Sequence, residues 1–158
     1  MRAVLVPGVL ALLPEHASQV DPVAELRASC TAAVGWLGAD VTVLAGPQGR
    51  RVGDHLLASA DRAGTDASWL VVGNGSAKRT EKAPGHVDPR AEEFDAALGE
   101  ALVAGRIDGL DLTLAADLWA DTDALAELGR VLPVGCRGRV DYADDPYGVQ
   151  WWVVRWEW

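Results

Sequence analysis

A glycine-rich loop at residues 73–87 holds the densest group of side chains in this sequence that could do chemistry. It follows the apolar run at residues 68–72, which predicts a buried strand, and in α/β folds ligands bind beyond the carboxyl ends of such strands. The backbone N–H groups of a glycine-rich turn can hold an anion, and nearby cations would help. The predicted ligand is therefore a small anion, and the candidate binding residues are Gly73, Asn74, Gly75, Ser76, Lys78, Arg79 and Lys82.

The same loop has three residues that could take part in catalysis. His86 and Glu81 could transfer protons, and Ser76 could act as a nucleophile. The loop has neither the Gly-Lys-Ser/Thr ending of a phosphate-binding loop nor the G-x-G-x-x-G of a dinucleotide site. The alternative is a solvated loop whose cations pair with Glu81, Glu92 and Glu93.

The three histidines of the chain, His16, His55 and His86, are candidates for a metal site. Each follows one of the first three predicted strands, and in a parallel sheet these connections emerge at one edge. The alternative is three unrelated histidines on the surface. The two cysteines form no metal or disulfide motif, and Cys30 is predicted to be a buried free thiol. No cofactor is predicted, with Fe(II) or zinc as the alternative.

The elements that must position these residues alternate between strand and helix. Short apolar runs at 3–6, 41–45 and 68–72 predict strands, and helices are expected at 21–37, at 54–63 and after Asp88-Pro89. This alternation is typical of a parallel sheet with helices packed on it. Two short helices are predicted near 112–119 and 123–132, with Trp119 on the buried side of the first. We expect one α/β domain spanning residues 1–158.

An antiparallel hairpin is predicted at the carboxyl end of the sequence, with strands at 138–143 and 149–158. Its second strand has apolar residues on both faces, so it should lie inside the sheet or under a second subunit. Four tryptophans within a few residues would form an apolar patch if they were exposed, which favours a homodimer. These tryptophans are Trp151, Trp152, Trp156 and Trp158.

The net charge of the chain bears on which macromolecules it could bind. The formal net charge is −9, which argues against binding to nucleic acid or to an anionic membrane surface. No apolar run is long enough to span a bilayer, because Pro7-Gly8 interrupts the first of them. The sequence is therefore expected to be cytoplasmic, with no nucleic-acid or membrane partner.

Several segments together resemble one known family. They are VPGVLALLPE, PVAELRASC, GNGSAKRTEKAPGHVDPRAEEFD and DDPYGVQWWVVRW. In this order they are similar to class III extradiol ring-cleavage dioxygenases, and more closely to the actinobacterial subunit-B-like (LigB-type) proteins. The resemblance covers roughly half the chain. It implies a three-layer α/β fold in which a mainly parallel sheet is flanked by helices.

The resemblance also implies an Fe(II) centre with two histidines and a carboxylate, and a further histidine as acid and base. This sequence departs from that pattern at each histidine position. Gly8-Val9 stands where a His-Pro pair is expected, and Ala77 stands where the acid/base histidine is expected. The predicted function is therefore a non-catalytic relative that binds a small anionic ligand or acts as an interaction or structural protein. The alternative is an enzyme, a metal-dependent dioxygenase or hydrolase, that uses relocated residues in the 73–88 loop.

Overall fold

A five-stranded mixed sheet forms the centre of the protein. The computed structural model describes residues 1–16 and 19–158. The strand order is β2-β3-β1-β5-β4, in which β2, β3 and β1 run parallel and β5 is antiparallel to both of its neighbours. The strands are β1 (Arg2–Val6), β2 (Val41–Leu44), β3 (Ser68–Val72), β4 (Arg139–Asp144) and β5 (Trp151–Glu157). The predicted α/β class, parallel core and terminal hairpin with an internal last strand are thus confirmed.

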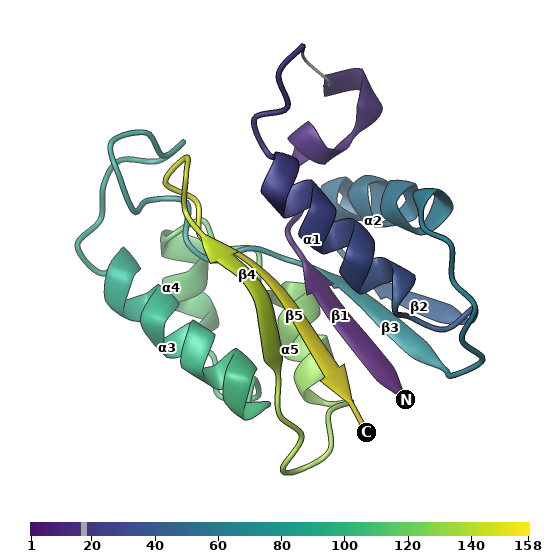
Figure 1. Cartoon of the computed structure of the whole chain (residues 1–158). Coiled ribbons are helices and arrows are strands. Elements are labelled where there is room, and N and C mark those ends of the chain that lie inside the picture. Colours follow the sequence, from purple (N-terminus) through teal and green to yellow (C-terminus); the bar gives the residue numbers. More distant parts are fainter. Residues whose placement is uncertain (17–18) are drawn as a thin grey trace.

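Alternate residues of the strands pack into two separate hydrophobic clusters. Leu5, Trp152 and Trp156 belong to one cluster, and Val4 and Val153 belong to the other. Helices α3, α4 and α5 supply the first cluster, whereas α1 and α2 supply the second (Figure 1). The helices are α1 (Ala24–Gly35), α2 (Pro47–Ser59), α3 (Ala91–Ala104), α4 (Leu112–Asp117) and α5 (Asp123–Gly129), with short 3-10 turns at Leu10–Leu12 and Pro14–His16.

Helix α2 begins seven residues earlier than predicted, at Pro47 rather than at Asp54. Proline is well suited to the first turn of a helix, because its missing N–H has no partner there. The glycines behind it are packing residues rather than loop residues. An added Cβ at Gly49 would lie 3.0 Å from Cγ1 of Val72, and one at Gly53 would lie 3.3 Å from Cγ2 of the same side chain. These glycines let α2 lie close against β3.

The two Asp-Pro pairs precede their helices instead of capping them directly. Asp21 Oδ1 accepts the N–H of Val23 at 3.1 Å, and α1 begins at Ala24. Asp88 Oδ1 accepts the N–H of Arg90 at 2.9 Å, and α3 begins at Ala91. Each aspartate therefore forms the turn that leads the chain into the helix.

The tryptophans of β5 are buried within a single chain. Trp151, Trp152 and Trp156 are 4%, 6% and 1% exposed. The indole N–H of Trp156 donates to the carbonyl of Leu102 at 3.1 Å, which connects β5 to α3. Exposure of this cluster was the reason for predicting a homodimer. These three tryptophans therefore form no exposed patch, whereas the fourth, Trp158, is partly buried and stacks on Trp69 at 5.5 Å. The homodimer stays a prediction.

The predicted free thiol is confirmed. Cys30 is fully buried on α1, and burial raises the pKa of its thiol to about 12. None of the helices within the described residues has both the length and the apolar character needed to cross a bilayer.

Candidate functional site

The loop at residues 73–88 runs from the end of β3 along the β4–β5 turn to the start of α3 (Figure 1). It is joined to the turn by backbone hydrogen bonds. The N–H of Gly75 donates to the carbonyl of Gln150 at 2.9 Å, and the N–H of Gln150 donates to the carbonyl of Ser76 at 3.0 Å. Further along, the N–H of Arg79 donates to the carbonyl of Gly148 at 3.1 Å. The loop is therefore an integral part of the body of the protein.

The backbone N–H groups at the start of the loop all donate to acceptors within the protein. Those of Gly73 and Asn74 donate to the carbonyls of Val6 and Asp121 at 3.1 and 3.0 Å. The next three N–H groups, of Gly75, Ser76 and Ala77, donate to Gln150, Asp95 and Leu118. This segment consequently has no donor N–H left to form the anion cradle that the glycine pattern suggested.

The glycines of this segment serve close packing. An added Cβ at Gly73 would lie 2.6 Å from the carbonyl oxygen of Asp121. At Gly75 it would lie 2.6 Å from a carboxylate oxygen of Asp95. Only a residue without a side chain allows the backbone to approach these groups so closely.

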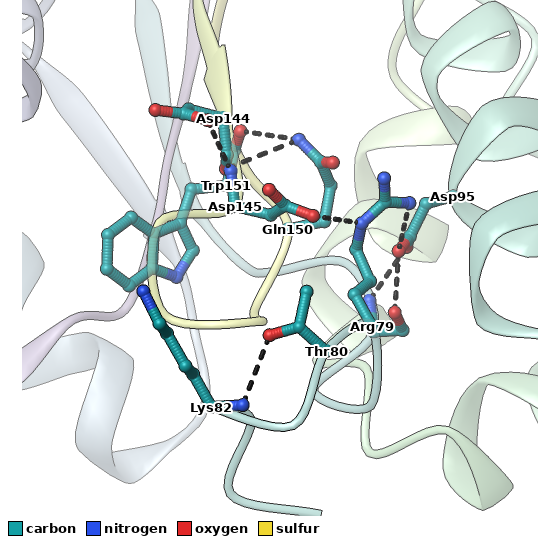
Figure 2. Close-up of polar contacts among 9 residues, drawn as sticks. Arg79, Thr80, Lys82, Asp95, Asp144, Asp145, Gln150 and Trp151 are labelled. Carbon is teal, nitrogen blue, oxygen red and sulfur yellow. Dashed lines mark hydrogen bonds and ion pairs between the residues drawn. The ribbon is translucent and has the colours of Figure 1, made fainter. Parts of the chain in front are cut away.

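Two of the candidate binding residues belong to a buried polar network (Figure 2). The carboxylate of Asp95 on α3 accepts the N–H of Ser76 at 2.8 Å and the hydroxyl of Ser76 at 2.5 Å. Arg79 lies 3.3 Å from the same carboxylate and also binds Asp145 in the β4–β5 turn. Burial raises the pKa of Asp95 above its usual value, although the bonds from Ser76 and Arg79 act in the opposite direction.

This network leaves Ser76 and Arg79 little freedom to meet a ligand. Ser76 is completely buried and its hydroxyl donates to Asp95, so no reacting group can reach it in this structure. Arg79 already pairs with two carboxylates. The side chain of Lys82 points away from Arg79, and its backbone N–H donates to the hydroxyl of Thr80 at 3.3 Å (Figure 2).

The positions where the resemblance places histidine ligands are held by other polar contacts. The N–H of Gly8 donates to Oδ1 of Asn74 at 3.1 Å, and the carbonyl of Gly8 accepts Nε2 of Gln48 at 3.1 Å. Asn74, a candidate binding residue, thus fixes the loop after β1. Ala77 is buried, 8% exposed, where the acid/base histidine would stand.

The structure does not bring the three histidines into one metal centre. His16 lines a small cavity with Pro14 and Arg27, His55 lies on α2, and His86 lies in the 73–88 loop. Across the described residues, no three His, Cys, Asp or Glu side chains gather in a way that could hold a metal ion. These residues therefore do not fit the Fe(II) centre that the resemblance implies, nor a zinc site.

Three other candidates, Lys78, Glu81 and His86, line one surface cavity of about 430 Å³. Its remaining lining comes from Ala83, Pro84, Gly85, Val87 and Trp119. The ring of Trp119 is 57% exposed, and the ammonium of Lys78 lies 5.1 Å from its centroid. A cation above an indole face is held by electrostatic attraction to the ring. This cavity is the candidate functional site.

Trp119 was predicted to be buried, and that prediction is wrong, because the residue is 57% exposed. The residue directly follows the C-cap of α4 and has a φ of 56°, in the left-handed region. Helices commonly place glycine there, because a side chain is strained in this conformation. Among the described residues, Trp119 is the one non-glycine residue with a positive φ. The backbone conformation turns the indole out of the core and over the cavity.

The comparisons with known proteins add no family assignment to this geometry. No protein-family model matches the chain, and no curated protein is significantly similar to it.

Proposed function

We propose that this protein is a non-catalytic relative of the extradiol dioxygenases that binds a small anionic ligand in the cavity formed by the 78–87 loop and Trp119. The three-layer arrangement of that family is part of the proposal, and the two hydrophobic clusters on either side of the sheet support it. The observation that carries the proposal is the exposed indole of Trp119 beneath the ammonium of Lys78.

The backbone of Trp119 supports a functional role for this residue. A left-handed conformation costs a non-glycine residue about 1–2 kcal/mol, and such strain often occurs at binding sites. The indole is largely exposed, so burial does not offset that cost. A ligand that stacks on the ring and places its anionic group at Lys78 would gain from both residues. Glu81 opposes an anion, but it is solvent-exposed, so its charge is screened.

The residues found at the family's histidine positions support loss of the chemistry. Gly8 and Ala77 have no group that could bind a metal or transfer a proton, and both are held by contacts within the protein. A protein that has lost these catalytic groups can still bind a ligand in its cavity without converting it.

The test is to titrate the protein with inorganic phosphate, citrate or benzoate and to measure binding by calorimetry and by tryptophan fluorescence. Lys78→Ala should weaken binding of the preferred anion about tenfold, because one charge-assisted contact is lost. Lys82→Ala is the matched control, since that lysine does not line the cavity, and it should bind like the parent protein.

Trp119→Gly separates function from stability. Glycine adopts a positive φ without strain, so this variant should unfold at a higher temperature than the parent. It should also lose binding, because the stacking surface is gone. A variant that binds as well as the parent, or that is less stable, would contradict the proposed role of Trp119.

The competing function is an enzyme acting at the same cavity, and one observation favours it. His86 and Glu81, two groups able to transfer protons, both line the cavity. Metal analysis of the purified protein tests the metal-dependent form of this alternative. Stoichiometric iron, zinc or manganese that is lost in His16→Ala or His86→Ala would establish a metal enzyme and overturn the non-catalytic proposal.

A further inference from the structure

A second and larger cavity, of about 560 Å³, lies along helix α3 and does not share a residue with the loop cavity. One wall is a stripe of α3 whose residues recur three or four positions apart, as on one face of a helix. The opposite wall is formed by residues 109–111 and Leu114. This wall is lined by Arg90, the N-cap of α3, and by the α3 residues Glu93, Phe94, Ala97, Leu98 and Ala101.

The middle of the groove is largely apolar, although Glu93 contributes a carboxylate to the α3 wall. Phe94 and Leu98 form part of it and are 8% and 1% exposed. The small side chains of Ala97 and Ala101 leave space that a larger residue would fill. Eleven residues separate Arg90, the N-cap of α3, from Ala101, which corresponds to a rise of about 16 Å, so the groove is long enough for an extended alkyl chain.

An arginine lies at each end of the groove, and the two differ in whether they form ion pairs. At the end near the start of α3, Arg90 is paired with Asp88 at 2.8 Å and Asp117 at 3.4 Å. At the other end, the guanidinium of Arg106 has no hydrogen bond or ion pair with any described residue. Asp111, on the rim, is occupied in capping α4, because it accepts the N–H groups of Thr113 and Leu114. An exposed arginine with no ionic partner among the described residues therefore lines one end of the groove, and the acidic residue Glu93 lines it nearer the start of α3.

We propose that this groove binds a straight-chain carboxylate, a medium-chain fatty acid, with its alkyl chain along α3 and its carboxylate at Arg106. The guanidinium can bind both oxygens of a carboxylate, and the alanine wall accommodates methylene groups. This site does not depend on the loop cavity or on its proposed ligand.

Calorimetric titration of the intact chain with octanoate, decanoate and dodecanoate, each below its micelle concentration, tests the proposal. Each pair of added methylenes should tighten binding about fifteenfold, since burial of one methylene contributes about 0.8 kcal/mol, until the groove is full. The methyl ester of decanoate lacks the charge and should bind about tenfold more weakly. Arg106→Gln should reduce decanoate affinity by a similar factor.

Two matched alanine substitutions locate the site. Ala97→Leu fills the groove and should abolish decanoate binding, whereas Ala96→Leu, on the neighbouring face of the same helix, should leave it unchanged. Both positions are exposed and leucine is a good helix former, so both variants should fold. Trp119→Gly should also bind decanoate normally, which separates this site from the loop cavity. Equal binding by the two leucine variants, affinity independent of chain length, or a dimer broken by Ala97→Leu without decanoate binding would each overturn the proposal.

Discussion

Asp95 shows how a single carboxylate can hold distant parts of the chain together. It lies on α3, accepts two hydrogen bonds from Ser76 in the loop and contacts Arg79, which in turn binds Asp145 in the β4–β5 turn. Its side chain is almost completely buried. A buried group with several partners is costly to remove, because each partner then loses its acceptor.

Asp95→Ala should lower the free energy of unfolding by about 2–4 kcal/mol, since it leaves the N–H and hydroxyl of Ser76 buried without an acceptor. Asp95→Asn keeps an acceptor oxygen of the same shape and should cost clearly less. Urea unfolding of the two variants measures the difference. Equal losses in both would show that the charge, rather than the hydrogen bonding, stabilises the protein at this position.

The contribution of Asp95 to the stability of the protein should change with pH in one direction. Burial raises the pKa of Asp95 in the folded protein above its ordinary value of 3.8, so the folded state binds the proton more tightly than the unfolded state. The stability contributed by this proton is complete below pH 3.8 and is lost as the pH rises through the folded pKa.

Asp95→Asn cannot titrate at this position and serves as the reference. The difference in unfolding free energy, parent minus Asp95→Asn, should therefore decrease as the pH is raised from below 3.8 through the folded pKa. Urea unfolding of both proteins at a series of pH values measures this difference in unfolding free energy. A difference that grows with pH would mean that Ser76 and Arg79 lower the pKa by more than burial raises it.

At the scale of elements, Gly75 is where the loop, α3 and β5 meet. An added Cβ would lie 2.6 Å from Oδ1 of Asp95 and 2.8 Å from both Cβ of Gln150 and Cζ3 of Trp152. Gly75→Ala should thus destabilise the protein by about 1–3 kcal/mol through overpacking. Gly109→Ala is the control, because a Cβ there meets no atom within 4 Å and should change stability little. Thermal unfolding of both variants provides the comparison, and similar melting temperatures would contradict the close packing at Gly75.

The strands could be predicted because each apolar run is followed closely by proline or glycine residues that end a strand. β1 ends at Pro7-Gly8, and β2 and β3 are short β-branched or apolar runs followed by glycine-containing turns. The start of α2 could not be predicted in the same way. Gly49 and Gly53 have the composition of a loop, and only their contact with Val72 in β3 explains them. Tertiary packing there overrides the low helix propensity of glycine.

The sequence could indicate that polar residues of the 73–88 loop lie together, but not which of them line a cavity and which are paired within the protein. Ser76 and Asn74 have the right types for a ligand site, yet their partners, Asp95 and Gly8, lie 19 and 66 residues away in the sequence. No local pattern shows that these polar groups are already occupied. Trp119 was missed because the pattern around it is helical, whereas α4 ends at Asp117 and the backbone then turns left-handed.

For the whole molecule, burial of the β5 tryptophans within one chain bears on its oligomeric state. Within the described residues, the large apolar side chains that remain exposed, such as Val20, Leu112, Trp119 and Val134, are scattered over several elements. Scattered apolar residues are ordinary on a monomer. We expect light scattering over a dilution series to give 16.7 kDa throughout. A mass that doubles at high micromolar concentration would instead establish the homodimer predicted from the sequence.

The strand order also determines when the sheet can be completed during synthesis of the protein. β1 is made first and lies between β3 and β5, and Arg2 on β1 pairs with Glu157 on β5, 155 residues later. Until β5 leaves the ribosome, one edge of β1 has no strand to pair with, and both apolar clusters lack the tryptophans of β5. An unpaired edge next to apolar surface invites association with other chains. The nascent chain should therefore need protection by chaperones until its last strand is inserted, and folding should be slow because that closure is so distant in the sequence.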